Sequence, residues 1–227
     1  MLRSLEVEGL IETRANTKDR RSRITQLTKA GEEEFAVYET LSNARAANIL
    51  ERHKDAKRLL DAMDIVNVAL SRENIVFEEA DYASEIATKC LHAFAAELSE
   101  RLNLTFDLKK SGDPDLSQMK PPNGTFVVAR LESMPVGCVG VKGNGGTLAE
   151  IKRMWIAPAA RGLGLARRLM STAEAAAQSL GIQTLRLDTN STLHEAVGLY
   201  RNMGWVEIDR FNDDPYPDLF FEKCLVP

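Results

Sequence analysis

The stretch from Ile151 to Met170 combines glycines and arginines in a spacing that suits the binding of a diphosphate. An apolar strand ends near Pro158, and a loop with Gly162 and Gly164 leads into a helix rich in Leu, Ala and Met. The first N–H groups of such a helix have no internal acceptor and lie at the positive end of its dipole. Glycines let the backbone approach a ligand closely. Three arginines add positive charge around the loop: Arg161, Arg167 and Arg168.

Known phosphate-binding patterns narrow the kind of diphosphate. Neither glycine is followed by Lys and Ser/Thr, so the P-loop pattern is absent. Arg167 stands where the dinucleotide-binding pattern requires its third glycine. The segment Arg161-x-x-Gly164-x-Ala166, after a strand that ends at Ile156, resembles the acyl-CoA signature of the GNAT N-acetyltransferase superfamily. An ordinary strand-to-helix loop with arginines facing water is the alternative.

Composition is that of a globular protein that has no overall attraction to nucleic acid. The 227 residues are 44% hydrophobic and 27% charged, with a net charge of −4. No apolar run approaches the ~20 residues that span a bilayer, and acidic residues interrupt the N-terminus where a signal peptide needs an apolar core. The three cysteines form no CxxC pair and no metal-ligand set with the histidines. We therefore expect a cytoplasmic protein without a structural metal.

From about residue 74 onward the pattern is α/β. Asp81 can cap the first helix, and Gly181 is a natural residue to follow the end of the helix after the glycine loop. The order of elements resembles the GNAT topology, an α/β fold with a mixed, mostly antiparallel sheet, over residues 74–227. The expected strands are 74–77, 125–131, 135–141, 147–156, 182–188, 205–211 and 219–223, and the expected helices include 82–102 and 193–203.

The resemblance implies acetyl-CoA as the acyl donor. In GNAT proteins the strand before the loop splays from its neighbour, and pantetheine lies between the two strands. The backbone of Met154, Trp155 and Ile156 would then bind pantetheine and the acetyl carbonyl, with the Ile156 N–H as the oxyanion donor. Asn190, which follows the next strand, would contact pantetheine, unless it only forms a turn. The diphosphate would lie on Arg161, Gly162, Leu163, Gly164, Leu165 and Ala166.

Tyr200 is the candidate general acid. It lies in the segment Ala196-x-x-x-Tyr200-x-x-x-Gly204-Trp205, which resembles the helix that carries a catalytic tyrosine in GNAT proteins. A tyrosine has an ordinary pKa of ~10, which suits it to protonate the thiolate that leaves when the thioester breaks. The alternative is a tyrosine that only stabilises its helix by packing.

Glu150 is the candidate general base, acting through water. Strand alternation predicts that Glu150 and Lys152 share a face with Met154 and Ile156, so that the carboxylate would lie near the oxyanion donor. A cross-strand partner for Lys152 or Arg153 is an equally good interpretation, and water alone could serve as the base. No cysteine is needed, and Cys138 and Cys224 are expected in the core of strands.

Residues 1–30 predict a β-hairpin around a basic loop. The segment from Gly9 to Gly31, with its Asp19-Arg20-Arg21-Ser22-Arg23 run and its Leu27-Thr28 step, resembles the wing of MarR-type winged-helix regulators. Residues 1–9 could supply at most the last turn or two of a recognition helix. A solvated basic face is the simpler interpretation. On the resemblance, weak DNA contact would come from Arg14, Arg20, Arg21 and Arg23.

Residues 32–71 read as two helices with apolar side chains at helical spacing, among them Phe35, Tyr38 and Leu41. The equivalent MarR helices form much of a dimer interface, so we expect a homodimer through residues 32–71. Packing against the following domain is the alternative. The chain is thus expected to hold a partial MarR-like unit over 1–71 and a GNAT domain over 74–227.

Two functions follow from these patterns. The first is an acetyl-CoA-dependent N-acetyltransferase that acts on a small-molecule amine. The second is a MarR-type DNA-binding regulator with an acyl-CoA-sensing domain. The acceptor would be shaped by residues 82–122 and by the acidic loop 212–218, which either attracts a cationic amine or is a solvated turn.

Overall fold

The structure, a computed structural model, describes residues 2–17, 21–108 and 116–225. These residues fall into two compact units that divide between Asp61 and Ala62, inside helix α3 (Ala56–Ser71). The division lies ten residues before the expected boundary at residue 71. The reason is that Val68, in the second half of α3, is fully buried in the core of the larger unit together with Ile75.

The smaller unit contains the expected hairpin. Strands β1 (Ile11–Ala15) and β2 (Arg23–Leu27) are antiparallel and pair from Ile11↔Leu27 to Ala15↔Arg23. A short helix, α1 (Leu2–Val7), precedes them, and a 24-residue helix, α2 (Lys29–Arg52), follows. Arg20, one of the candidate DNA-contacting residues, lies outside the described residues.

The Thr28-x-x-Gly31 step joins the hairpin to α2. The Thr28 hydroxyl accepts a hydrogen bond from the Gly31 N–H (3.1 Å) and donates one to the Gly9 carbonyl (2.6 Å). A Cβ on Gly31 would lie 1.9 Å from the Leu10 carbonyl oxygen, so no larger residue fits. The glycine of the MarR-like segment is therefore explained here by close packing of the backbone.

The larger unit is built on one seven-stranded sheet with the order β3-β4-β5-β6-β7-β9-β8. Only β6 and β7 pair in parallel; the other neighbouring strands of this sheet are antiparallel. This is the mixed, mostly antiparallel sheet that the sequence predicts. The strands are β3 (Val76–Glu79), β4 (Thr125–Leu131), β5 (Met134–Gly143), β6 (Leu148–Ile156), β7 (Thr184–Thr189), β8 (Val206–Ile208) and β9 (Leu219–Cys224).

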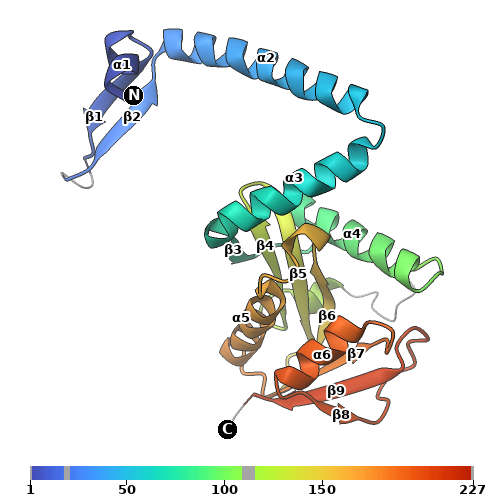
Figure 1. Ribbon diagram of the computed structural model, residues 1–227. Helices are drawn as coiled ribbons and strands as arrows, with labels where there is room; N and C mark the ends of the chain where they lie inside the picture. Colours follow the sequence, from blue (N-terminus) through green and yellow to red (C-terminus); the bar gives the residue numbers. More distant parts are fainter. Residues whose placement is uncertain (1, 18–20, 109–115, 226–227) are drawn as a thin grey trace. The chain divides into compact units, whose positions relative to one another are not determined.

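Helices cover both faces of this sheet (Figure 1). Helix α5 (Leu165–Ser179) packs on one face, and its buried Leu169 and Ala173 belong to the main core. Helix α4 (Glu85–Arg101) packs on the other face with a smaller core around Phe126. Helix α6 (His194–Asn202) connects β7 to β8, and short 3₁₀ turns lie at Arg72–Asn74, Leu116–Met119 and Pro158–Ala160. No helix in the described ranges has the length and apolarity to cross a bilayer.

Two local expectations at helix ends have different outcomes. Helix α4 begins at Glu85, three residues later than expected, and Ser84 rather than Asp81 caps it by accepting from the Ala87 N–H. Asp81 instead accepts from the Ala83 N–H (2.8 Å) in the preceding turn. At the other helix, Gly181 follows the C-cap of α5 with φ +80°, as predicted.

The cysteines also differ from the expectation. Cys138 is fully buried in β5, as predicted for a strand core residue, whereas Cys224 is exposed. Strand alternation puts Cys224, the last residue of β9, on the face opposite Phe221 and Leu225, which are buried in the main core, so the expectation for it was wrong.

A β-bulge interrupts β6 at Arg153. Cys138 pairs with Trp155 and Gly140 with Lys152, so two residues of β6 oppose one of β5, and Arg153 has a φ of +58°. The bulge reverses the alternation of side chains along the strand. Ile151 and Ile156, five residues apart, therefore share the α5 face. The expectation that Glu150 and Lys152 share a face with Met154 and Ile156 was wrong for this reason.

Candidate active site

Strands β6 and β7 separate at the bulge. Their parallel pairing runs from Leu148↔Thr184 to Ile151↔Leu187 and goes no further. Beyond that point β6 keeps pairing with β5 only, through Trp155 and Ile156. Among the described strands, the edge of β6 that faces away from β5 is thereby left without a partner, which is the splay that the GNAT resemblance implies.

A cavity of about 530 Å³ opens at this splay. Its walls come from α4, the second half of β6, the loop and first turn of α5, the end of β7, α6 and the loop between β8 and β9. Two of the twelve predicted site residues, Leu163 and Glu150, are not among its described lining residues. The other ten line it: Met154, Trp155, Ile156, Arg161, Gly162, Gly164, Leu165, Ala166, Asn190 and Tyr200.

 Nine of these ten are cofactor-binding candidates, and the tenth is the candidate acid Tyr200. One cavity therefore joins the predicted cofactor loop to the predicted proton donor.

The loop before α5 has the form of an anion cradle. Gly162 and Gly164 both have φ +75°, and a Cβ on either would meet nothing within 4 Å, so open space lies beside the backbone. Among the described residues, the first hydrogen bond back to this loop is from the Arg168 N–H to the Gly164 carbonyl (3.3 Å). The N–H groups of residues 163–167 therefore have no backbone acceptor in the described part of the chain, as a diphosphate at a helix N-terminus requires.

The side chains in this loop have separate roles. Leu165 is buried in the main core and Leu163 packs partly against it, so both present only their backbone to the loop. Arg161 donates to the Ile156 carbonyl from Nε (3.2 Å) and Nη2 (3.0 Å). Its Nη2 also donates to both carboxylate oxygens of Glu97, each at 2.6 Å. These contacts of Arg161 hold the loop close to β6 and α4.

Ile156 has its backbone directed into the splay. The Ala157 N–H donates to the Val136 carbonyl (2.9 Å), so residue 157 faces β5. Because backbone groups of neighbouring strand residues point in opposite directions, the N–H and carbonyl of Ile156 face away from β5. The contact of Arg161 with the Ile156 carbonyl agrees with this direction. The Ile156 N–H therefore points into the splay.

Tyr200 reaches the cavity from α6. The residue is only 5% exposed, and its ring packs near Trp205 (6.2 Å between centroids) and Phe221 (6.0 Å). Burial raises the pKa of Tyr200 well above its ordinary value, and the negative charge of Asp188 raises it further. The phenol therefore keeps its proton at neutral pH, as a proton donor must.

Asn190 lies at the end of β7 and uses its whole side chain within the protein. Its Nδ2 donates to the Tyr216 carbonyl (2.9 Å), and its Oδ1 accepts from the N–H (3.1 Å) and hydroxyl (2.7 Å) of Thr192. These are the contacts of a turn-forming asparagine. They also hold the loop between β8 and β9 against the end of β7.

Glu150 lies before the bulge, beside the cavity but not in its wall. It is opposite Lys142 and Arg186 on the neighbouring strands, and its Oε2 lies 3.1 Å from the Lys152 Nζ. Lys152 lines the cavity and also contacts Asp188 Oδ2 at 2.7 Å. Burial alone would lower the pKa of Lys152, but the two carboxylates outweigh burial and raise it. The contact with Lys152, two residues along the same strand, is the structural alternative to the catalytic role.

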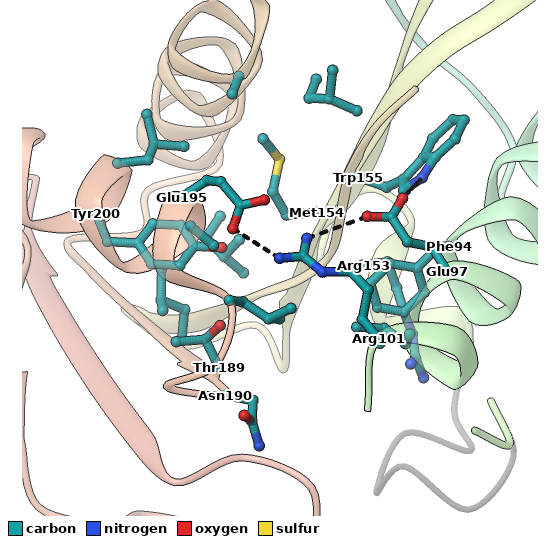
Figure 2. A pocket seen from close by; sticks show the side chains of 18 of the residues that line it. Phe94, Glu97, Arg101, Arg153, Met154, Trp155, Thr189, Asn190, Glu195 and Tyr200 are labelled. Carbon is teal, nitrogen blue, oxygen red and sulfur yellow. Dashed lines mark hydrogen bonds and ion pairs between the residues drawn. The ribbon is translucent and has the colours of Figure 1, made fainter. Parts of the chain in front are cut away.

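An ion-pair bridge crosses the cavity from α4 to α6. Arg101 donates to Glu195 from Nη2 (2.8 Å) and to Glu97 from Nη1 (3.3 Å). Figure 2 shows these two contacts as dashed lines that meet at one guanidinium. Glu97 also accepts from the Trp155 Nε1 (3.0 Å). The bridge connects both sides of the cavity, although Arg101 and Glu195 are 94 residues apart in the sequence.

Sequence reasoning missed this bridge and the aromatic residues beside it. Phe94, Phe106 and Tyr216 line the cavity, and the guanidinium of Arg153 lies 5.8 Å and 6.0 Å from the ring centroids of the first two. A partial signal was present, since Phe94 and Arg101 are seven residues apart and so share one side of the expected helix 82–102. No comparable signal marks Asp188 or Glu195 as cavity residues.

Comparison with known proteins gives a consistent result. Residues 85–205 match the acetyltransferase (GNAT) family. The chain is 37% identical over 117 residues to the IAA acetyltransferase of Azospirillum brasilense, across 49% of this chain and 74% of that protein. It is 31% identical over 121 residues to an uncharacterised N-acetyltransferase of Escherichia coli K12, YjgM, across 50% of this chain and 72% of that protein.

Solved structures share the fold. A GNAT-family acetyltransferase from Staphylococcus aureus superposes with a TM-score of 0.57 at 20% identity, over 66% of this chain and all of that one (100%). Another from Elizabethkingia anophelis, solved with acetyl-CoA bound, superposes with a TM-score of 0.50 at 17% identity, over 67% of this chain and 99% of that one. The expected fold class, a GNAT acyl-CoA N-acyltransferase fold, is confirmed.

Proposed function

Because the chain belongs to the GNAT acetyltransferase family, whose members use acetyl-CoA, we propose that it acetylates the primary amine of a small molecule. The amine attacks directly, in a ternary complex with the acyl donor. The single observation that carries this proposal is the shared cavity, which brings the glycine loop, the strand splay and Tyr200 together.

The chain supplies binding and proton transfer, while acetyl-CoA supplies the acetyl group as a reactive thioester. The N–H groups of residues 163–167 hold the diphosphate, and the Ile156 N–H stabilises negative charge on the acetyl oxygen, a contact worth ~3 kcal/mol of barrier. As the amine nitrogen forms its bond to the acetyl carbon, the bond from that carbon to sulfur breaks. The amine loses one proton, and the phenol of Tyr200 returns one to the departing thiolate.

The base that takes the amine proton is proposed to be water, with Glu150 at the end of the path. Glu150 is supported by its half-buried position beside Lys152, which lines the cavity. Its absence from the described cavity wall favours an indirect role over direct contact with the amine.

Direct attack is supported by the kinds of side chains in the cavity. Cys90, Cys138 and Cys224 are absent from its described wall, so none of them is placed to carry the acetyl group. Initial rates measured while both substrates are varied test this point. Intersecting lines in a double-reciprocal plot are expected for a ternary complex. Parallel lines would indicate a covalent acetyl-enzyme and would contradict direct attack.

For the smaller unit we propose a weak contact with DNA, on the resemblance of residues 1–71 to a partial MarR-type wing. The described arginines of the hairpin, Arg14, Arg21 and Arg23, are exposed, although Arg14 contacts Glu12. A regulator that senses acyl-CoA is the alternative function for the whole chain. Gel-shift titrations at two salt concentrations separate the two. Non-specific, salt-sensitive binding fits the proposal, and tight sequence-selective binding would favour the regulator.

We also propose a homodimer through residues 32–71, in the cytoplasm. Large apolar side chains are exposed on α2 and on α3, and on α3 Met63, Val66 and Leu70 lie opposite the buried Val68. Their 3–4 spacing is typical of a helix that packs against another helix. Light scattering should give twice the chain mass for the protein and a lower mass for a Met63→Glu, Leu70→Glu variant. A monomeric protein at micromolar concentration would contradict the dimer.

A further inference from the structure

An aromatic wall bounds one end of the cavity. It consists of Phe94 on α4, Phe106 just after α4, and Tyr216 in the loop between β8 and β9. The Phe94 and Phe106 centroids are 5.7 Å apart in an edge-to-face arrangement, and those of Phe106 and Tyr216 are 4.9 Å apart. Three rings from separate segments thus form a continuous apolar surface, and such surfaces favour flat apolar groups.

The loop that carries Tyr216 is held firmly in place. Arg210 donates to the carbonyls of Asp214 (3.0 Å) and Pro217 (2.8 Å), and Asn190 donates to the carbonyl of Tyr216 (2.9 Å). Asn212, in the same loop, donates to Asp188 Oδ2 at 2.6 Å. The aromatic wall is therefore pre-formed on its Tyr216 side, and this loop also touches the end of β7.

Asp188 provides a carboxylate in the same cavity, at the point where β6 and β7 separate. Its side chain is 13% exposed. The Lys152 Nζ (2.7 Å) and the Asn212 Nδ2 (2.6 Å) both contact Oδ2, and no contact of Oδ1 is found with the described residues. Lys152 also contacts Glu150, so one ammonium group stands between two carboxylates. Asp188 therefore offers a carboxylate oxygen to a cationic group at this end of the cavity, where the guanidinium of Arg153 also lies, 5.8 Å from the Phe94 ring centroid.

We infer that this end of the cavity binds the acceptor, and that the acceptor is a primary amine carried on an aromatic ring, an arylalkylamine. The inference rests on the proposed acetyl transfer and names the substrate class for that site. The ammonium group approaches Asp188 Oδ1 while the ring lies on Phe94, Phe106 and Tyr216. The ammonium gives one proton to water before its nitrogen attacks. Asp188 and Tyr200 line the same cavity, so an amine held by Asp188 lies in the cavity that contains the proton donor.

A matched pair of amines tests the ring contact. 2-Phenylethylamine and butylamine each carry one primary ammonium group, but only the first carries a ring. We expect kcat/KM for 2-phenylethylamine to exceed that for butylamine by about 10-fold. Phe106→Leu should remove this preference by lowering kcat/KM for 2-phenylethylamine to about that for butylamine. Phe211→Leu is the control, because Phe211 packs on Phe220 and is not among the described cavity residues.

Asp188→Asn tests the ammonium contact. It should lower kcat/KM for both amines by about 10-fold or more, since it removes the charge that both amines share. Asp209→Asn, at an exposed position before the same loop, should change neither value. An equal kcat/KM for the two amines, or a preference that survives Phe106→Leu, would overturn the inference.

Calorimetry separates this inference from the proposed function. Both amines are titrated into the protein with coenzyme A present, so that binding is measured without turnover. Tighter binding of 2-phenylethylamine that is lost in Phe106→Leu supports the substrate class even if no amine releases thiol from acetyl-CoA. Thiol release with butylamine, together with no binding preference for the ring, would leave acetyl transfer standing and reject the substrate class.

Discussion

At the scale of single residues, the chemistry depends on how protein surroundings change ordinary side chains. Tyr200 is buried beside a negative charge, and both effects disfavour its phenolate. Its pKa is therefore raised, and the protonated form persists up to and beyond the ordinary tyrosine pKa of ~10. Gly162 and Gly164 of the cofactor loop act in another way. They adopt a positive φ, and they leave open space beside the backbone that a side chain would fill.

Removing the Tyr200 hydroxyl should affect the rate and not cofactor binding. We expect Tyr200→Phe to lower kcat by about 100-fold or more, since the thiolate loses its proton donor. The Kd for acetyl-CoA, measured by calorimetry, should stay within about 3-fold. Because the pKa of Tyr200 is raised, the kcat of the unmodified protein should show no loss from tyrosine ionisation between pH 7 and 9.

The control for this variant is Tyr82→Phe. Tyr82 is also buried, but it packs against Phe126 and is not among the described residues of the cavity. Its kcat should be that of the unmodified protein. Equal kcat values for the Tyr200→Phe variant and the unmodified protein would remove the general acid role.

Gly164 offers a direct test of the diphosphate cradle. Gly164→Asp places a carboxylate in the open space beside the loop and strains a backbone with φ +75°. We expect the Kd for acetyl-CoA to rise by about 100-fold or more, through repulsion and lost room. Gly181→Asp is matched, since Gly181 has φ +80° and open space at the other end of α5. Similar affinities for the two variants in calorimetry would argue against the cradle.

The sequence predicts these residues because their signal is local. Arg161, Gly164 and Ala166 lie within six residues of one another, and the glycine conformations follow from that short motif. Glu150 was assigned to the wrong face because one extra residue at Arg153 reverses strand alternation, and a bulge leaves no regular mark in the sequence. Glu195 was missed because its partner Arg101 is remote in the chain.

At the scale of elements, the site exists because β6 and β7 separate. The bulge at Arg153 bends β6 just after its last pairing with β7, and the cavity occupies the space that results. Helices α4 and α6 approach this space from two sides. The contacts of Arg101 with Glu195 and Glu97 connect the two helices across it.

The bridge should retain the acyl donor. Glu195→Gln removes the charge that holds Arg101 from α6, so we expect acetyl-CoA to dissociate several-fold faster in stopped-flow measurements. The free energy of unfolding should change by less than about 1 kcal/mol, because Glu195 is largely exposed. Arg101→Gln should have the same effect, and the double variant should be no worse than either single one.

A matched surface pair serves as the control. Arg201 and Glu207 are 3.0 Å apart, exposed, and outside the described cavity wall. Glu207→Gln should leave the dissociation rate unchanged. If the bridge does not retain the acyl donor, acetyl-CoA will dissociate from the Glu195→Gln variant at the same rate as from the Glu207→Gln variant.

Most elements of the larger unit were predictable because periodic apolar residues and turn-forming glycines mark them. The strands from β4 to β7 and the end of α5 follow these local patterns closely. The start of α4 was not predictable, since Asp81 and Ser84 are both good N-cap residues. In the structure Asp81 accepts from the Ala83 N–H in the preceding turn, and Ser84 is left to cap the helix. The loop between β8 and β9 reads as an acidic turn, and its role in the cavity depends on contacts with Asn190 and Asp188.

At the scale of the whole molecule, the chain divides into two compact units. Every described residue of the cavity belongs to the larger unit, residues 62–227. In the smaller unit, Thr28 and Gly31 join the hairpin to α2. The sequence placed the boundary later because α3 is one continuous helix, and only the burial of Val68 assigns its second half to the larger unit.

This separation predicts that damage to the smaller unit leaves catalysis intact. Gly31→Ala forces a Cβ against the Leu10 carbonyl, so we expect the smaller unit to lose about 3 kcal/mol or more of stability. Hydrogen exchange should become faster across residues 2–52 while kcat/KM stays within about 2-fold. Ser42→Ala, at an exposed position of α2, should change neither. Loss of activity in Gly31→Ala would show that the units depend on each other.

We propose that the larger unit transfers an acetyl group from acetyl-CoA to an amine without an acetylated protein intermediate. The most direct test of this proposal is mass spectrometry of a reaction that contains acetyl-CoA carrying an isotope in the acetyl group, the protein and 2-phenylethylamine. We expect N-acetyl-2-phenylethylamine that carries the isotope, formed in equal amount to the released thiol, with the protein mass unchanged. Thiol release with no acetylated amine, or an acetyl group retained on the protein, would contradict it.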